Sequence, residues 1–345
     1  MKKFLVNTLV FGLIFLLITF LLDMVKVSDD YMINKTATSS FEKIAWNLDL
    51  IKNHSSKIKG SSIFFGPSLT QAGLCDSTLS SNGIPSVNFG INGAGNEVSL
   101  FFLRRVIGLK PGKIYLHLFK DGHKDLHKMT PLLYDPVSLL KSGQSINFNF
   151  IQFLIKRPYF ILDYLGWELM GNKMAAKKYK EYGVVYEPVN FTPQEYTAIR
   201  KEKTDEYFES CNLSQTKFIK RSELGRSGLG FKIIRYRRAV LYYLWNSEFT
   251  HNCRSQETFV ASALALCRKN NLPVCQLYMP LIADAKINRD FDESFFSPGK
   301  KESVIALKNF SFLDTVVYWS DMTHLSTQGS KIFTQALIDE KLVKP

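Results

Sequence analysis

The sequence predicts an α/β fold in which a parallel sheet of five strands is covered by helices on both faces. Short apolar runs alternate with stretches of helical periodicity from Gly60 to Phe119, and again from Ser255 to the C-terminus. Strands that alternate with helices form parallel sheets, because each helix carries the chain back to the start of the next strand. The 345 residues, 46% of them hydrophobic, allow one large domain of this kind or two modest ones.

The expected elements follow from local patterns. Apolar runs bounded by Gly, Pro and Asn predict strands at 61–65, 85–91, 113–119, 272–281 and 312–319. Helical spacing of apolar residues predicts helices at 96–109, 255–271, near 299–309 and at 326–342, and the first of these ends before a Lys-Pro-Gly stop signal. In open parallel sheets, functional sites form at the carboxyl ends of the strands.

The first 27 residues lie outside this pattern and predict a membrane anchor. Lys2 and Lys3 precede the uncharged run Phe4 to Leu22, which at about 1.5 Å per residue is long enough to span a bilayer. A cleavable signal peptide is the alternative, but the following residues, DMVKVSDDY, offer no small-x-small cleavage site. We therefore expect a retained transmembrane helix, with the N-terminus in the cytoplasm and the remaining chain on the outer side.

Residues 28–59 are expected to form a linker and a leading helix before a domain at 60–345. Within that domain, 121–254 interrupt the alternation of strands and helices and predict a large, mostly helical insertion that serves as a lid or a partner-binding subdomain. Its stretch 150–170 is rich in aromatic and aliphatic residues, and either packs on the core or lies as an amphipathic patch on the membrane. Lys156 and Arg157 in its middle argue against a second span.

Charge and cysteine content limit the partners. The net charge of +13 indicates either a basic surface that aids solubility or attraction to membrane headgroups or an acidic envelope polymer. A nucleic-acid partner is not expected on the outer side of a membrane, and no nucleic-acid motif is present. None of the five cysteines forms a C-x-x-C pair, which disfavours a metal site or thioredoxin-type chemistry. No cofactor is expected. Cys267 and Cys275 are predicted to be small buried residues.

Two segments at predicted strand ends carry a nucleophile and a base. Ser68 follows the first strand in Gly66-Pro67-Ser68, and Asp321 and His324 follow the last in DMTHLSTQG. A serine is a poor nucleophile until a base takes its proton, and a histidine held by a carboxylate is the usual base. The three-residue spacing lets the Asp321 carboxylate turn back onto the His324 ring. The alternative is that Ser68 is only a turn residue.

The segment NFGINGAGN, 88–96, follows the second strand and supplies glycines. An acyl-transfer intermediate carries an oxyanion that needs backbone N–H donors, and glycine lets the backbone approach closely. Gly93 is the candidate donor together with the N–H of Ser68, and Asn92 beside it is a candidate for substrate binding. The alternatives are a plain glycine-rich turn and a dinucleotide fingerprint, and the order G-x-x-G-x-G is wrong for the latter.

Together, these three segments resemble the blocks of the SGNH (GDSL-type) hydrolase superfamily. The resemblance covers 60–120 and 255–342 and implies a three-layer, flavodoxin-like α/β/α fold. It also implies Ser68 as nucleophile, His324 as base with Asp321 as its orienter, and Gly93 as oxyanion donor. Two positions depart from the family pattern: Gly-Pro-Ser replaces Gly-Asp-Ser, and Lys120 stands where an asparagine usually donates to the oxyanion. Lys120 is retained as a candidate donor.

Within the superfamily, the organisation looks most like membrane-anchored envelope proteins of bacteria. These include the D-alanine transfer protein of teichoic acids and the alginate and peptidoglycan O-acetylation proteins. The resemblance implies an acyltransferase or esterase that faces the periplasm or cell exterior, acts on an envelope glycan or polymer, and works beside a multi-span membrane O-acyltransferase. The alternative is a non-catalytic accessory protein that binds such a glycan or acyltransferase. The sequence does not distinguish acetyl from D-alanyl or longer acyl groups.

Overall fold

The computed structural model describes residues 2–37, 39, 41–118, 126–170, 255–281, 285, 304–319 and 324–344, with the backbone alone at 2, 5, 13–20, 170, 255 and 316. Its centre is one five-stranded sheet in the order β2-β1-β3-β4-β5. Every pair of neighbouring strands is parallel. The strands are β1 (Ser62–Phe65), β2 (Ser86–Asn88), β3 (Lys113–His117), β4 (Val274–Leu277) and β5 (Val304–Ile305). The predicted α/β class with a five-stranded parallel sheet is confirmed.

The strand register brings the carboxyl ends of β1, β3 and β4 to one edge of the sheet. Phe65 pairs with Leu116, and His117 pairs with Leu277. The chain leaves each strand there, so the segments that follow the strands lie along this edge.

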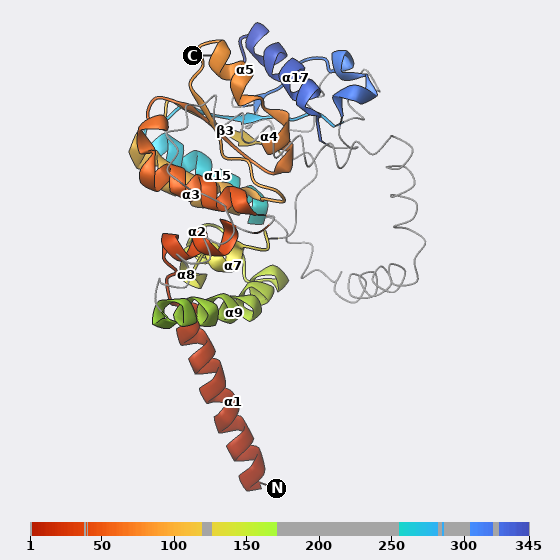
Figure 1. Cartoon of the computed structure of the whole chain (residues 1–345). Coiled ribbons are helices and arrows are strands. Elements are labelled where there is room, and N and C mark those ends of the chain that lie inside the picture. Colours follow the sequence, from red (N-terminus) through yellow and green to blue (C-terminus); the bar gives the residue numbers. More distant parts are fainter. Residues whose placement is uncertain are drawn as a thin grey trace.

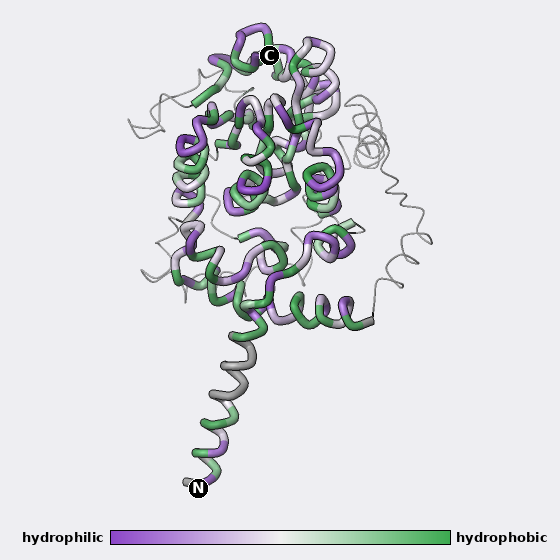
Figure 2. The backbone as a smooth tube through the Cα atoms, turned by 90° about the vertical axis from the view of Figure 1, so that its left-hand side faces the viewer, coloured by the Kyte–Doolittle hydropathy of each residue, from purple (hydrophilic) through white to green (hydrophobic). Residues whose placement is uncertain are grey.

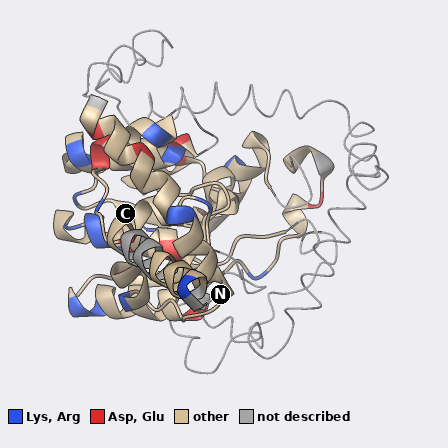
Figure 3. Ribbon diagram, turned by 90° about the horizontal axis from the view of Figure 1, so that it is seen from below, with Lys and Arg blue, Asp and Glu red and all other residues tan. Residues whose placement is uncertain are grey.

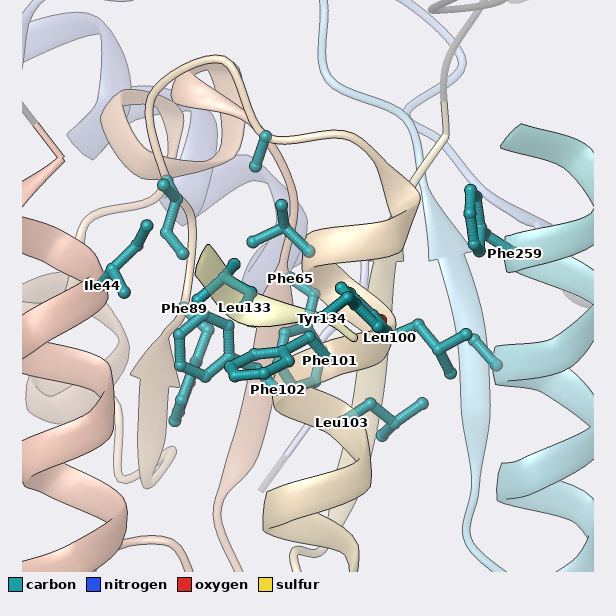
Figure 4. Packing of buried hydrophobic residues seen from close by; sticks show 14 of the residues in the cluster. Ile44, Phe65, Phe89, Leu100, Phe101, Phe102, Leu103, Leu133, Tyr134 and Phe259 are labelled. Carbon is teal, nitrogen blue, oxygen red and sulfur yellow. The ribbon is translucent and has the colours of Figure 1, made fainter. Parts of the chain in front are cut away.

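Helices cover both faces of the sheet (Figure 1). On one face lie α3 (Glu42–Asn53), α6 (Asn96–Val106) and α15 (Ser255–Lys269). Figure 4 shows Leu100, Phe102 and Leu103 of α6 packed between the other two helices. This core also contains Ile63 and Phe65 of β1. The helix α6 continues as a short 3-10 turn, Ile107–Leu109, so the helix predicted at 96–109 is present.

The opposite face of the sheet carries the second core. Phe64, whose side chain alternates with those of Ile63 and Phe65, packs there on Tyr115 with ring centroids 4.4 Å apart. The helices on this face are α4 (Ser68–Gly73), α5 (Asp76–Ser81) and α17 (Thr327–Asp339). Ser326 caps α17 by accepting a hydrogen bond from the N–H of Gly329 at 3.1 Å, as the sequence predicts.

Two predicted elements near the C-terminus are wrong. The helix predicted near 299–309 is replaced, within its described part, by β5, and the strand predicted at 312–319 forms two 3-10 turns, Ser311–Leu313 and Val316–Tyr318. Short apolar runs do not distinguish helix from strand by periodicity, and the backbone of Val304 and Ile305 pairs with β4. The Trp319 indole instead donates to the Leu313 carbonyl at 2.9 Å, which stabilises the turns.

The N-terminal helix α1 (Lys2–Asp23) extends away from the sheet domain (Figure 1). Figure 2 shows apolar positions along it. Between α1 and the sheet lie α2 (Asp29–Ala37), α7 (Thr130–Leu133), α8 (Pro136–Lys141) and α9 (Phe148–Met170). Among the described residues, no helix has both the length and the apolar character required to cross a membrane. Of the predicted insertion, only 126–170 is described, and it is helical.

The packing around Cys267 and Cys275 makes their chemistry testable. Both side chains are buried and free, as predicted. Burial raises the pKa of Cys267 to about 11 and that of Cys275 to about 12. Only a thiolate is alkylated rapidly, so at pH 8.5 we expect both to react with iodoacetamide at least roughly a hundredfold more slowly in the native protein than in urea. Peptide mass spectrometry measures both rates. Equal rates in the two states would contradict this packing.

Candidate active site

The structure brings Ser68 and His324 into hydrogen-bond contact. The Nε2 atom of His324 lies 2.7 Å from the Oγ atom of Ser68, although 256 residues separate them in the sequence. Both side chains are partly exposed, so an external substrate can reach them. This is the distance expected between a serine and the base that takes its proton.

Ser68 stands at the start of a helix because of the turn that precedes it. After β1, the chain passes through Gly66 to Pro67, which is extended, and Ser68 is the first residue of α4. The first intrahelical bond of α4 runs from the N–H of Gln71 to the Pro67 carbonyl at 3.0 Å. The N–H of Ser68 therefore has no acceptor within the helix, which is the property that its predicted role as oxyanion donor requires.

The backbone that follows His324, at the start of α17, holds this residue in place. The next residue, Leu325, forms an antiparallel bridge with Trp319. The following N–H, of Ser326, donates to the Tyr318 carbonyl at 2.8 Å. His324 thus follows a 3-10 turn rather than the fifth strand, and the fixed backbone on its C-terminal side holds its ring beside Ser68.

Gly66 allows the turn before Ser68 to pack against the sheet. A Cβ atom at this position would lie 2.1 Å from the Thr70 Oγ1 atom and 2.6 Å from the Cβ atom of His117. These two neighbours are hydrogen-bonded to each other, with 3.2 Å between Thr70 Oγ1 and His117 Nδ1. His117 is a buried residue at the end of β3.

The loop after β2 lies directly against the turn before Ser68. The N–H of Ile91 donates to the Gly66 carbonyl at 3.0 Å, and a Cβ atom on Gly90 would lie 2.5 Å from the Gln71 backbone nitrogen. Asn92 and Gly93 then reach the surface, and Gly93 has a φ of +67°, which favours glycine. The candidate oxyanion segment and Ser68 therefore lie on the same edge of the sheet.

Asn88 holds these two segments together, a role that the sequence analysis missed. Its side chain is fully buried. The amide nitrogen donates to the Thr70 carbonyl at 3.0 Å, and the amide oxygen accepts from the N–H of Gly90 at 2.8 Å. One side chain thus fixes the spacing between α4 and the Gly93 loop. The position of Asn88 at the end of a predicted strand was the only sequence signal for this role. Asparagine is also common in turns where it has no such role.

His127 and Glu97 fix the outer side of the loop and were also missed. His127 Nδ1 accepts from the N–H of Met129 at 3.2 Å, so its Nε2–H donates to the Asn92 carbonyl at 3.0 Å. The buried Glu97 carboxylate accepts from the N–H of His127 at 2.7 Å and from the Gln256 amide at 2.8 Å. These partners lie far from Asn92 in the sequence, and only the fold brings them together.

Tyr134 completes this network. Burial raises the pKa of the Tyr134 hydroxyl above its usual range, so the group stays protonated. It donates to the Glu97 carbonyl at 2.7 Å. The start of α6 is therefore anchored to the segment around α7 by hydrogen bonds to both the carboxylate and the backbone carbonyl of Glu97.

The other predicted site residues, Lys120 and Asp321, lie outside the described residues, and their roles stay predictions. His123 lies outside them as well. Within the described part of the chain, no group of three or more His, Cys, Asp or Glu side chains is placed to hold a metal ion.

Comparison of the chain with protein-family models, curated proteins and solved structures finds no match. The geometry by itself allows one type of chemistry. A serine hydroxyl in contact with an imidazole, next to glycine-rich backbone at the edge of a parallel sheet, can act as a nucleophile toward a carbonyl group.

The close packing at Gly66 predicts a sharp loss on substitution. We expect Gly66→Ala to displace Thr70 or the α4 turn, to lower the free energy of unfolding by about 1–3 kcal/mol, and to separate Ser68 from His324. Urea unfolding measures the first effect, and reaction of Ser68 with a serine-directed fluorophosphonate measures the second.

Gly108→Ala is the matched control, because no atom lies within 4 Å of the added Cβ and its φ is not in the left-handed region. We expect that variant to unfold like the unmodified protein. A Gly66→Ala protein that is as stable and as reactive as Gly108→Ala would contradict the packing described for the turn.

Proposed function

We propose that this protein carries out serine-dependent acyl transfer, as an O-acyltransferase or esterase acting on a cell-envelope glycan or polymer. The observation that carries the proposal is the 2.7 Å contact between Ser68 Oγ and His324 Nε2. A surface serine needs no such partner for stability, whereas a nucleophilic serine needs a base at this distance.

The reaction begins with proton transfer from Ser68 to His324. Ser68 Oγ attacks the ester carbonyl while Nε2 of His324 accepts the hydroxyl proton, which requires the other ring nitrogen to carry a hydrogen. Asp321 is the predicted acceptor for that hydrogen. The N–H groups of Ser68 and Gly93 are the predicted donors to the oxyanion, and Lys120 is a further candidate.

Collapse of the intermediate releases the alcohol, which takes the proton from His324 and leaves an acyl group on Ser68. A second alcohol or a water molecule then gives its proton to His324 and attacks the acyl-serine. The bond between the acyl group and Ser68 Oγ breaks, and Ser68 Oγ takes the proton back from His324. A sugar hydroxyl as acceptor makes the reaction a transfer, and water makes it a hydrolysis. Both outcomes use the same residues, so the acceptor depends on the shape of the site.

The strand order supports the fold-level part of the proposal. The order β2-β1-β3-β4-β5 is the one found in flavodoxin-like sheets, which bind ligands at the carboxyl ends of their strands. An SGNH-type fold has this architecture, and the segments that resemble its blocks lie at that edge. Because folds host many functions, the Ser68–His324 contact has more weight than the strand order. The N-terminal anchor and the outward-facing location stay predictions.

A non-catalytic accessory role is the second candidate. The exposed apolar side chains of α9, among them Ile155 and Leu162, are the observation that favours it, because such a face can contact a multi-span membrane acyltransferase. In that case Ser68 and His324 would touch without reacting.

A fluorophosphonate probe distinguishes the two candidates. We expect the probe to label the protein at Ser68, as measured by intact and peptide mass spectrometry. Ser68→Ala should abolish labelling because the nucleophilic oxygen is removed. His324→Gln should slow it by about 10²–10⁴-fold because the base is lost.

Ser80→Ala is the matched control, since Ser80 lies near the end of α5, away from the contact between Ser68 and His324. It should leave the labelling rate unchanged. Retained labelling of Ser68→Ala at the unmodified rate would overturn the proposed nucleophile, and a folded protein that is not labelled at all would favour the accessory role.

A further inference from the structure

The exposed apolar side chains of this protein are concentrated at one end of the molecule. Among the described residues, sixteen large apolar side chains are exposed, and only Phe312 and Val317 lie outside the region formed by α1, α8, α9 and the segments joining them. Figure 1 places these helices below the sheet domain, on the side from which α1 extends. Exposed apolar side chains gathered in this way indicate a contact surface, whereas scattered ones do not.

The helix α9 is apolar on two opposite faces. Its inner face buries Phe150, Phe153, Arg157 and Ile161 against the rest of the protein. Its outer face exposes a stripe at intervals of three or four residues, which we call the outer stripe: Ile151, Ile155, Tyr159 and Leu162. The exposed fraction reaches 73% for Ile155. A helix on a water-facing surface carries polar residues on its outer side, so the outer stripe is unsuited to water.

Exposed apolar side chains also lie on α1, and they indicate what covers the outer stripe. The described side chains in the first half of α1 include Phe4, Val6, Leu9, Val10 and Phe11, all exposed. At 100° per residue they project from several sides of the helix and cover more than half of its circumference. A protein partner on one side would leave the others in water, whereas lipid surrounds a helix completely.

Arg157 fixes α9 against the end of α1. Arg157 is 1% exposed, and its guanidinium donates to the carbonyls of Asp23, at 2.6 Å, and Val25. These carbonyls lie at the C-terminal end of α1, where a helix leaves acceptors unpaired and favours a positive charge. Burial lowers the Arg157 pKa to about 10, which leaves it charged at neutral pH. The junction between the two helices is therefore rigid.

The direction of α9 relative to α1 matches a helix at a lipid–water boundary. In Figure 1, α9 runs across the end of α1 rather than along it, and Figure 3 shows the molecule from this end. If α1 enters a bilayer along its normal, α9 lies parallel to the surface. Asp163, which borders the outer stripe, is ion-paired with Lys35 at 2.5 Å, and the exposed Lys156 has a long stem that can reach the headgroups.

We propose that the outer stripe of α9 lies in the interface of a lipid bilayer and seats the sheet domain on the membrane. The proposal rests on the predicted entry of α1 into lipid, but not on the proposed acyl transfer. Amphipathic helices with aliphatic and aromatic side chains on one face bind at this depth. In this arrangement α9 fixes both the distance and the orientation of the Ser68 edge relative to the membrane.

Site-specific photocrosslinking of the full chain tests the proposal. Benzoylphenylalanine replaces Ile155, Leu162, Phe11 or Phe312, one per variant, in protein reconstituted into phosphatidylcholine–phosphatidylglycerol vesicles. The four sites are all exposed apolar positions, and circular dichroism with thermal unfolding checks that each variant is folded. After irradiation, mass spectrometry quantifies lipid adducts at the probe.

We expect several-fold more lipid adduct at 155 and 162 than at 312, and a comparable amount at 155 and 11. A second outcome is that lipid adduct forms at residue 11, while residues 155 and 162 give no more adduct than residue 312. That outcome would overturn the proposal but leave the α1 anchor in place. Adducts at 155 that join two protein chains, or the protein to a membrane protein partner, would also overturn it. If no site gives more lipid adduct than residue 312, the α1 anchor is contradicted as well. Fluorophosphonate labelling of Ser68 tests the proposed chemistry separately.

Discussion

Parallel pairing of β1 with its two neighbours is the constraint on which the site depends. Because β2, β1 and β3 run in the same direction, the segments that leave them emerge at one edge. Gly66, Gly90 and His117 meet there within van der Waals or hydrogen-bond distance of α4. An antiparallel neighbour would place one of these segments at the opposite edge. The contact between the Ser68 turn and the loop after β2 is therefore a consequence of topology first and of local sequence second.

Holding the site requires several buried polar groups, each of which must be satisfied. Asn88 and Glu97 are both fully buried, and an unpaired buried amide or carboxylate destabilises a fold by several kcal/mol. Here Asn88 bonds to α4 and to Gly90, while Glu97 bonds to His127 and Gln256. Because these bonds form only when α4, the Gly93 loop and the segment around α7 are all in place, they favour one arrangement of the edge over looser alternatives.

The sequence was sufficient for the elements with strong, regular patterns. The sheet class, four of the five strands, α6, α15 and the Ser326 cap of α17 follow from apolar periodicity and turn residues. Prediction from the sequence failed where an apolar run was short. Val304–Ile305 is a strand only because β4 offers backbone partners, whereas 312–319 forms turns because its polar groups bond locally. It identified Ser68 and His324 through their flanking residues. It missed His127 because a bond to the Asn92 carbonyl exists only in the folded chain.

The helix α9 and the candidate site are connected by one run of hydrogen bonds. Arg157 of α9 donates to the carbonyls of Pro131 and Tyr134 at either end of α7. The Tyr134 hydroxyl bonds to Glu97, and Glu97 bonds to the N–H of His127.

His127 in turn holds the Asn92 carbonyl, next to Gly93. Each link in this series is a direct bond between side chain and backbone, with little freedom to rotate. A domain tethered only by a flexible linker would sample many orientations of its site. Here direct bonds join α9 to the loop beside Ser68, so the two move as one body. If α9 lies at a bilayer surface as proposed, this connection holds the candidate site at a fixed height above it.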